Sequence, residues 1–127
     1  MKISILLPYK ENFSPEYPGA VSLFINDTTL ISKYKKIIKV FGSTMYRTKF
    51  KVPYVNINLK NRMIGSHSRE YINKFVKHEV LRQSDLIEIH NRPNYLKILI
   101  SKLNKRNYTV FFHNDPLSME GSKTTDD

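Results

Sequence analysis

Residues 85–116 read DLIEIHNRPNYLKILISKLNKRNYTVFFHNDP. Two apolar runs in this stretch, at 86–89 and 108–112, each lead directly into a His-Asn pair. The residues between them carry apolar side chains at helical spacing. The pattern therefore predicts a strand, a helix and a second strand, with the same polar pair at the carboxyl end of both strands. In an open parallel sheet, ligands bind at that edge.

The remainder of the chain continues this alternation of strands and helices. Apolar runs predict further strands at 2–7, 36–41 and 54–59, and helical spacing predicts helices over 19–32 and 67–83. Strands that alternate with helices predict an α/β, Rossmann-like three-layer αβα domain with a mostly parallel sheet. Right-handed crossovers then place the carboxyl ends of all the strands at one edge.

Apolar spacing also predicts which face of each helix is buried, and two prolines predict where helices begin. Pro18 and Pro93 fit the first turn of a helix, where the missing N–H costs nothing. Ser66 or Ser68 can cap the helix of residues 67–83. The expected buried positions are Val21, Phe24, Ile25, Thr28 and Ile31 in the first helix, Ile72, Phe75, Val76 and Val80 in the second, and Leu96, Leu99, Ile100 and Leu103 in the third.

Length and composition limit the classes to which the protein can belong. A chain of 127 residues is long enough for one domain with its own core. The absence of cysteine excludes disulfides and thiolate metal sites. No apolar run approaches the roughly 20 residues that span a bilayer. The short run from Ile3 to Leu7, closed by Pro8, is expected to be a strand and not a signal peptide.

The formal net charge is +10, from 21 Lys and Arg against 11 Asp and Glu. Part of this charge can come from codon bias, because Lys, Asn, Ile and Tyr are all frequent in AT-rich coding sequences. The functional interpretation is attraction to the phosphates of a nucleotide, a nucleic acid or a membrane surface. The basic residues are spread from Lys33 to Lys105 without the aromatic-basic interleaving of the type that stacks single-stranded bases, so nucleic-acid binding is not expected.

Several well-defined site motifs are absent. The four glycines stand at 19, 42, 65 and 121, so the chain contains no GxGxxG dinucleotide loop, no GxxxxGK[ST] phosphate loop and no GxSxG nucleophile elbow. These absences exclude a classical NAD site, a P-loop NTPase and an α/β-hydrolase.

Polar groups at the carboxyl edge of the predicted sheet remain as site candidates. Gly19 precedes a helix whose first N–H groups could bind phosphate, although a glycine at a helix start is common. His90 and His113 could bind a sugar hydroxyl or phosphate, act as acid or base, or be structural residues. A zinc site of His90, His113 and Asp115 would need three ligands within about 2.0–2.2 Å of the metal, and no metal is expected.

Other aromatic and histidine side chains are expected to be structural. His67 and His78 are predicted at the surface of their helix, and Tyr71 and Phe75 in the core. Residues 115–127 are predicted to form a flexible polar tail, which ends in TTDD, a helix-start signature. We interpret this ending as the point where a longer protein continues, with a simple frayed tail as the alternative.

Four segments together resemble the N-terminal domain of glycosyltransferase family 4. They are KISILLP at 2–8, PGA at 18–20, DLIEIHNRP at 85–93 and FHNDPLSMEGSK at 112–123, of which the last is the most specific. Enzymes of this family have the GT-B fold, with two Rossmann-like domains around a cleft. The resemblance implies retaining transfer of a sugar from a nucleotide-sugar donor to a saccharide or lipid-linked acceptor, with the acceptor site shaped by the N-terminal domain.

The resemblance also implies roles for single residues. Gly19 corresponds to the glycine loop near the donor diphosphate, although Pro18 stands where many members have a second glycine. His113 corresponds to the strand-end histidine at the reaction centre, and His90 with Asn91 to the neighbouring edge of the cleft. The substrate-facing positions implied beyond this strand are Asn114 and, in a mobile loop, Ser118, Gly121, Ser122 and Lys123.

The family holds its donor through paired glutamates and basic residues of a C-terminal domain, and residues 1–127 do not supply them. We therefore expect this single domain to be inactive alone and to need no cofactor besides the donor. The resemblance implies synthesis of cell-envelope polysaccharide or lipopolysaccharide in the cytoplasm, where the positive charge would suit the inner face of the membrane. The alternative is a non-catalytic α/β binding module, or a subunit that docks a separate donor-binding partner.

Overall fold

The computed structural model describes residues 1–59 and 67–113. The five strands in these ranges form one sheet of order β3-β2-β1-β4-β5, and each pair of neighbours is parallel. The predicted α/β class with a parallel sheet is therefore confirmed. The elements are β1 (Ile3–Leu6), α1 (Ala20–Ile31), the 3₁₀ helix η1 (Lys35–Ile37), β2 (Ile38–Gly42), β3 (Tyr54–Asn56), α2 (His67–Arg82), β4 (Leu86–His90), α3 (Tyr95–Lys102) and β5 (Asn107–Phe111).

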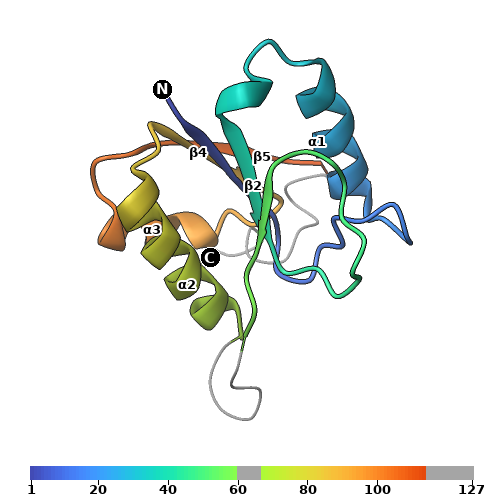
Figure 1. The fold of residues 1–127 in the computed structure, drawn as a ribbon. Helices are drawn as coiled ribbons and strands as arrows, with labels where there is room; N and C mark the ends of the chain where they lie inside the picture. Colours follow the sequence, from blue (N-terminus) through green and yellow to red (C-terminus); the bar gives the residue numbers. More distant parts are fainter. Residues whose placement is uncertain (60–66, 114–127) are drawn as a thin grey trace.

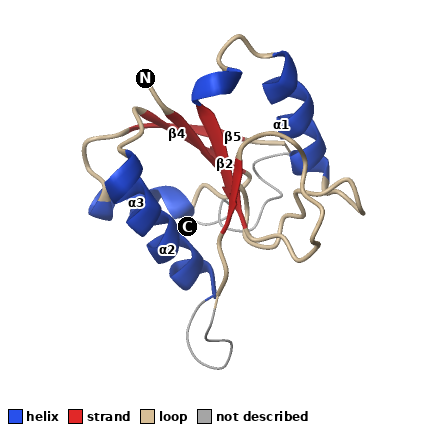
Figure 2. Ribbon diagram, viewed as in Figure 1, coloured by secondary structure: helices blue, strands red, loops and turns tan. Residues whose placement is uncertain are grey.

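The helices cover the two faces of the sheet unequally. Helix α1 lies on one face, and α2 and α3 lie side by side on the other, which gives the three-layer arrangement of Figures 1 and 2. The period of two residues along β1 divides its side chains between the layers, because Leu6 packs in the core under α2 and α3 while Ile5 and Leu7 pack under α1. No helix in the described ranges has the length and apolar character needed to cross a bilayer.

Several element boundaries differ from the sequence prediction. The strand predicted from residue 36 begins at Ile38, because Ile37 closes a 3₁₀ turn by donating its N–H to Tyr34 O at 2.9 Å. The strand predicted over 54–59 ends at Asn56. Strand β5 begins at Asn107, one residue before the predicted apolar run, because Asn107 pairs in register with Leu86 of β4. Such pairing is a tertiary contact that apolar spacing does not report.

Both prolines lie just before their helices and not in the first turn. Gly19 is the N-cap of α1 and Asn94 is the N-cap of α3. Helix α2 begins at His67, so Ser68 lies inside the helix and is not its cap, while Ser66 is outside the described residues.

The buried faces of the helices are rotated from the predicted ones. In α2, Val80 is 56% exposed and Glu79 is fully buried, so the prediction for Val80 is wrong. In α1, Ser22 and Thr29 are buried where Phe24, Thr28 and Ile31 were expected, and in α3 Ile100 is exposed. Hydrogen bonds explain part of this rotation. Ser22 and Glu79 can be buried because each has a polar partner inside the fold. The predictions for Tyr71 and Phe75 in the core and for His78 at the surface are confirmed.

Candidate functional site

The strand order creates a topological switch point between β1 and β4. The chain leaves β1 toward α1 on one face and leaves β4 toward α3 on the other, so their loops diverge at the carboxyl edge. A crevice outside such a point is the usual ligand site of open α/β sheets. A hollow of about 520 Å³ lies there, which we call the histidine hollow; its lining is Pro8, Tyr9, Lys10, Glu11, Ala20, Val21, Asn91, Arg92 and His113.

Two histidines meet at the edge of this hollow. His90 Nδ1 lies 2.8 Å from His113 Nε2, and His90 Nε2 lies 3.4 Å from Glu88 Oε1. The parallel register pairs His90 with Phe111. Because side chains two residues apart share one face of a strand, Glu88 and His90 of β4 lie beside Phe111 and His113 of the β5 segment. The sequence predicted both histidines at this edge, and the structure brings them into direct contact.

Neighbouring groups fix the positions of both rings. The ring of Phe111 stacks on His90, with centroids 4.9 Å apart and planes 4° apart, and the ring of Phe24 meets His113 edge-on at 4.9 Å. The backbone N–H of His113 donates to Asn91 Oδ1 at 2.7 Å. Asn91 has φ 56°, a left-handed conformation that asparagine tolerates better than most residues. Asn91 therefore ties the end of β4 to the residue that follows β5.

Burial lowers the pKa of His113 below its ordinary value of 6.5. The neighbouring His90 lowers this pKa further, and the carboxylate of Glu11 acts in the opposite direction. The lowered pKa of His113 therefore favours its neutral form at pH 7. A neutral imidazole offers one N–H donor and one bare nitrogen that can accept a hydrogen bond or a proton.

The N-terminus of α1 is covered by a carboxylate. Glu11 Oε2 accepts hydrogen bonds from the Ser22 N–H at 3.0 Å and from Ser22 Oγ at 2.9 Å. A Cβ on residue 19 would lie 1.8 Å from the same oxygen, so Gly19 makes room for Glu11. A phosphate at this helix end would have to displace Glu11, and the role of Gly19 near a donor diphosphate stays a prediction.

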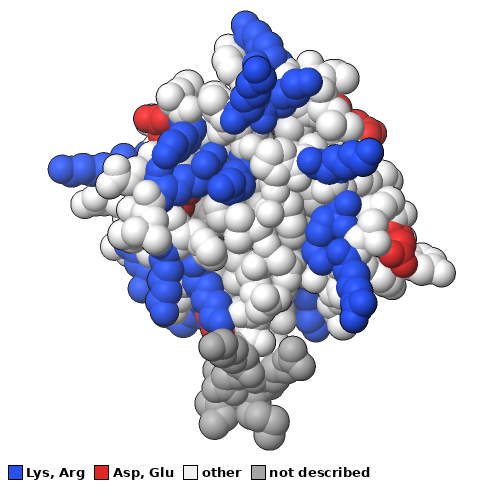
Figure 3. All heavy atoms as spheres, viewed as in Figure 1, with Lys and Arg blue, Asp and Glu red and all other residues white. Residues whose placement is uncertain are grey.

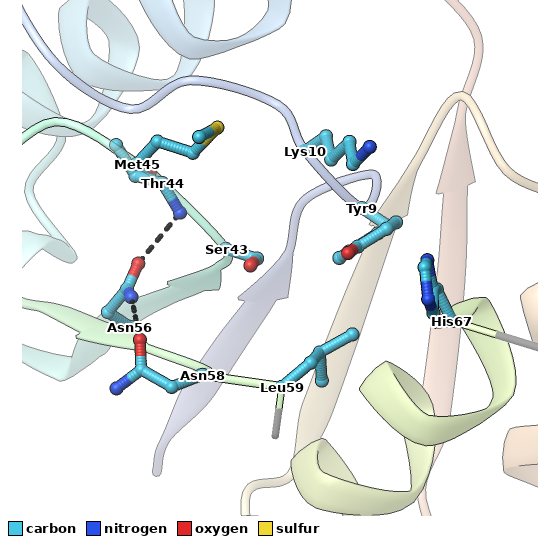
Figure 4. A pocket seen from close by; sticks show the side chains of 9 residues that line it. All are labelled: Tyr9, Lys10, Ser43, Thr44, Met45, Asn56, Asn58, Leu59 and His67. Atoms are coloured by element: carbon cyan, nitrogen blue, oxygen red, sulfur yellow. Dashed lines mark hydrogen bonds between the residues drawn. The ribbon is translucent and has the colours of Figure 1, made fainter. Parts of the chain in front are cut away.

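A second hollow, of about 460 Å³, lies at the carboxyl edge beyond β2 and β3 (Figure 4). It adjoins the histidine hollow, since Tyr9 and Lys10 line both. We call it the asparagine hollow; the remaining lining residues are Ser43, Thr44, Met45, Asn56, Asn58, Leu59 and His67.

A hydrogen-bond ladder orders one wall of the asparagine hollow. Asn56 Oδ1 accepts from the Thr44 N–H at 2.7 Å and from the Tyr54 hydroxyl at 2.8 Å, while Asn56 Nδ2 donates to Asn58 Oδ1 at 2.7 Å. Burial raises the pKa of Tyr54 to about 12, so its hydroxyl keeps its proton as a donor. With Asn58 Oδ1 used in this way, the exposed Asn58 amide has N–H groups to offer a ligand.

Tyr9 forms the boundary between the two hollows. Its backbone N–H donates to the Tyr95 hydroxyl at 3.0 Å, and its ring contacts Tyr71 at 5.5 Å and His67 at 5.9 Å between centroids. His67 is half-buried against Tyr9, which corrects the prediction that it is simply a surface residue. The sequence pattern did not predict this hollow, although Ser43 comes just after a predicted strand; Asn58 was expected inside a strand and instead follows β3.

The predicted site residues fall into two groups. The structure gathers Gly19, His90, Asn91 and His113 along one edge, but both ring nitrogens of His90 have partners within the chain. A substrate contact by His90 stays a prediction. The other predicted positions lie outside the described residues: Asn114, Asp115, Ser118, Gly121, Ser122 and Lys123. Within the described ranges, no group of three His, Cys, Asp or Glu residues is placed to hold a metal ion.

The basic side chains form several separate groups on the face shown in Figure 3, with uncharged surface between them.

Comparison of the chain with protein-family models, with curated proteins and with solved structures found no match.

Proposed function

We propose that this chain is the N-terminal, acceptor-binding domain of a retaining glycosyltransferase, which transfers a sugar from a nucleotide-sugar donor to a saccharide or lipid-linked acceptor. The observation that carries the proposal is the position of His113, a neutral imidazole beside a hollow of about 520 Å³ at the switch point of a parallel sheet. The resemblance of residues 85–93 and 112–123 to family 4 supports the same assignment.

The two hollows suit the two parts of such a reaction. His113 would bind a sugar hydroxyl at the reaction centre through its ring Nδ1, since Nε2 is the nitrogen that contacts His90. The asparagine hollow offers amide and hydroxyl groups that match the hydroxyls of an acceptor saccharide, and Lys10 could neutralise an acceptor phosphate. The shared wall at Tyr9 would then place the acceptor next to His113.

The proposal assigns the nucleotide to a second domain that these residues do not contain. We accordingly propose that the domain alone does not transfer sugar, and that its positive charge favours the anionic inner face of the cytoplasmic membrane during envelope polysaccharide or lipopolysaccharide synthesis. Sustained sugar transfer by the purified chain of residues 1–127 would contradict the first of these statements.

The test compares two histidine variants in the complete enzyme. His113→Ala should lower kcat/KM by about 100-fold or more, the usual contribution of a group that exchanges protons in the transition state. His78→Ala removes an exposed histidine of α2 and should change kcat/KM by less than about twofold. Equal and small effects of both substitutions would exclude His113 as the centre of the reaction.

The alternative, a subunit that docks a separate donor-binding partner, is favoured by exposed aromatic rings near the site. Phe111 and Phe112 at the end of the outer strand, and Phe24 of α1, are all partly exposed to solvent. The coding sequence after Asp127 distinguishes the two proposals. An in-frame second domain supports the transferase, and a stop codon supports the separate subunit.

A further inference from the structure

A carboxylate and two imidazoles lie in a row that joins two hollows of the molecule. Glu88 and His90 line a hollow of about 220 Å³ beneath α1, and His113 lines the histidine hollow. His90 lies between them, with its side chain 1% exposed, and contacts both Glu88 and His113. We propose that Glu88 and His90 are positioning residues that fix the tautomer of His113 and form a proton relay from the histidine hollow to His90, with the carboxylate of Glu88 as the counter-charge.

The direction of the hydrogen bonds follows from what each group can donate. An ionised carboxylate only accepts, so His90 must donate its single N–H from Nε2 to Glu88. His90 Nδ1 is then bare, and His113 must donate its N–H from Nε2 to it. His113 Nδ1 is therefore left unprotonated, as an acceptor. The carboxylate of Glu88 thus determines the tautomer of a ring that it does not touch.

The same row can carry a proton. When His113 Nδ1 takes up a proton from a group in the histidine hollow, the Nε2 proton of His113 can pass to His90 Nδ1. His90 becomes an imidazolium with its Nε2–H on Glu88, while His113 is neutral again. The reverse shift returns the proton. The step balances, because the proton that His113 Nδ1 gains comes from an O–H of the group in the hollow, and the proton that His90 Nδ1 gains comes from His113 Nε2.

Within the relay, the carboxylate of Glu88 is the group that would balance a positive charge on His90. Phe111 stacks on His90 and Phe24 meets His113 edge-on, so each imidazole has an aromatic ring against it. The charged groups that face the pair are Glu88 from β4, Glu11 from the loop after β1, and Lys10 and Arg92 around the histidine hollow. Of these, only Glu88 has an atom within hydrogen-bond distance of His90, and its side chain is 21% exposed.

The inference can be tested on the purified chain without substrate, by long-range ¹H–¹⁵N NMR of the imidazole rings. At pH 7.5 both rings should show the Nε2–H tautomer. Glu88→Gln removes the charge, so the apparent pKa of the pair should fall by about one unit. Glu88→Asp, which keeps the charge on a shorter side chain, should give a smaller shift. Glu16→Gln removes the charge of an exposed glutamate and serves as the control, so it should leave the apparent pKa of the pair unchanged.

Unchanged tautomers and an unchanged pKa in Glu88→Gln would overturn the relay, provided that the amide spectrum shows a folded chain. The catalytic use of the relay rests on the proposed function and has a separate readout in the complete enzyme. There, Glu88→Gln should move the acid limb of the kcat/KM profile to lower pH by the shift seen in the NMR titration. A shift in the NMR titration without one in the kinetic profile supports the relay and contradicts His113 as the reaction centre.

Discussion

Replacing Glu79 by alanine should destabilise the fold far more than replacing its neighbour Val80. The two residues are adjacent in α2, but Glu79 is fully buried and Val80 is 56% exposed. Apolar spacing alone predicts the reverse order, because it places the valine in the core. The comparison therefore tests the orientation of α2 and the role of a buried carboxylate together.

The expected cost follows from the partners of the carboxylate. Glu79 accepts hydrogen bonds from Ser4 Oγ at 2.5 Å and from the Ser84 N–H at 3.1 Å, and Arg106 Nε lies 3.5 Å away. A buried donor left without a partner costs about 1–3 kcal/mol. Removing one member of a buried ion pair costs about 3–5 kcal/mol, which we expect for Glu79→Ala. That is a large share of the roughly 5–15 kcal/mol by which domains are stable.

The assay is urea unfolding followed by far-ultraviolet circular dichroism, with the free energy of unfolding from linear extrapolation. Val80→Ala should change this free energy by less than about 0.5 kcal/mol, as exposed substitutions usually do. Glu79→Gln keeps an acceptor oxygen and should lie between the two alanine variants. A larger loss for Val80→Ala than for Glu79→Ala would refute the placement of α2.

Two further predictions concern the carboxyl edge. Glu11→Ala removes the cap of α1 and should lower the free energy of unfolding by about 1 kcal/mol in the same assay, whereas Glu16→Ala, an exposed control, should not. Because the pKa of His113 is lowered in the folded state, the unfolded chain binds more protons between that pKa and 6.5, so stability should fall as the pH drops through this window. His113→Gln should weaken that pH dependence, and an identical slope in both proteins would contradict the inferred neutral state of His113.

The strand–helix alternation and the histidine edge could be predicted because both are local properties. A strand buried on both faces reads as a continuous apolar run, and its end is marked by the first polar residues. The segment of residues 85–113 carries two apolar runs, one in the interior strand β4 and one in the more exposed outer strand β5, and the end of each run predicts a histidine at the same edge.

The orientation of each helix could not be read in the same way. Periodicity finds a stripe of apolar residues, but the sheet decides which stripe is buried. In α1 the stripe that includes Ser22 is buried because Glu11, from a separate loop, accepts its hydrogen bonds. In α2 Glu79 is buried because Ser4, from β1, and Ser84, from the loop between α2 and β4, donate hydrogen bonds to its carboxylate. Ser4 is 75 residues from Glu79 in the sequence, and the apolar spacing of a helix reports none of these polar contacts.

The sequence by itself determined the α/β class and the presence of histidines at the carboxyl edge, because alternation and polarity are written along the chain. Only the tertiary structure decided that the two imidazole rings contact each other. The register that pairs His90 with Phe111 brings His113 to 2.8 Å from His90 and leaves Glu88 on the other side of that ring. Register between parallel strands is set by packing of both faces of the sheet, which is a property of the whole domain.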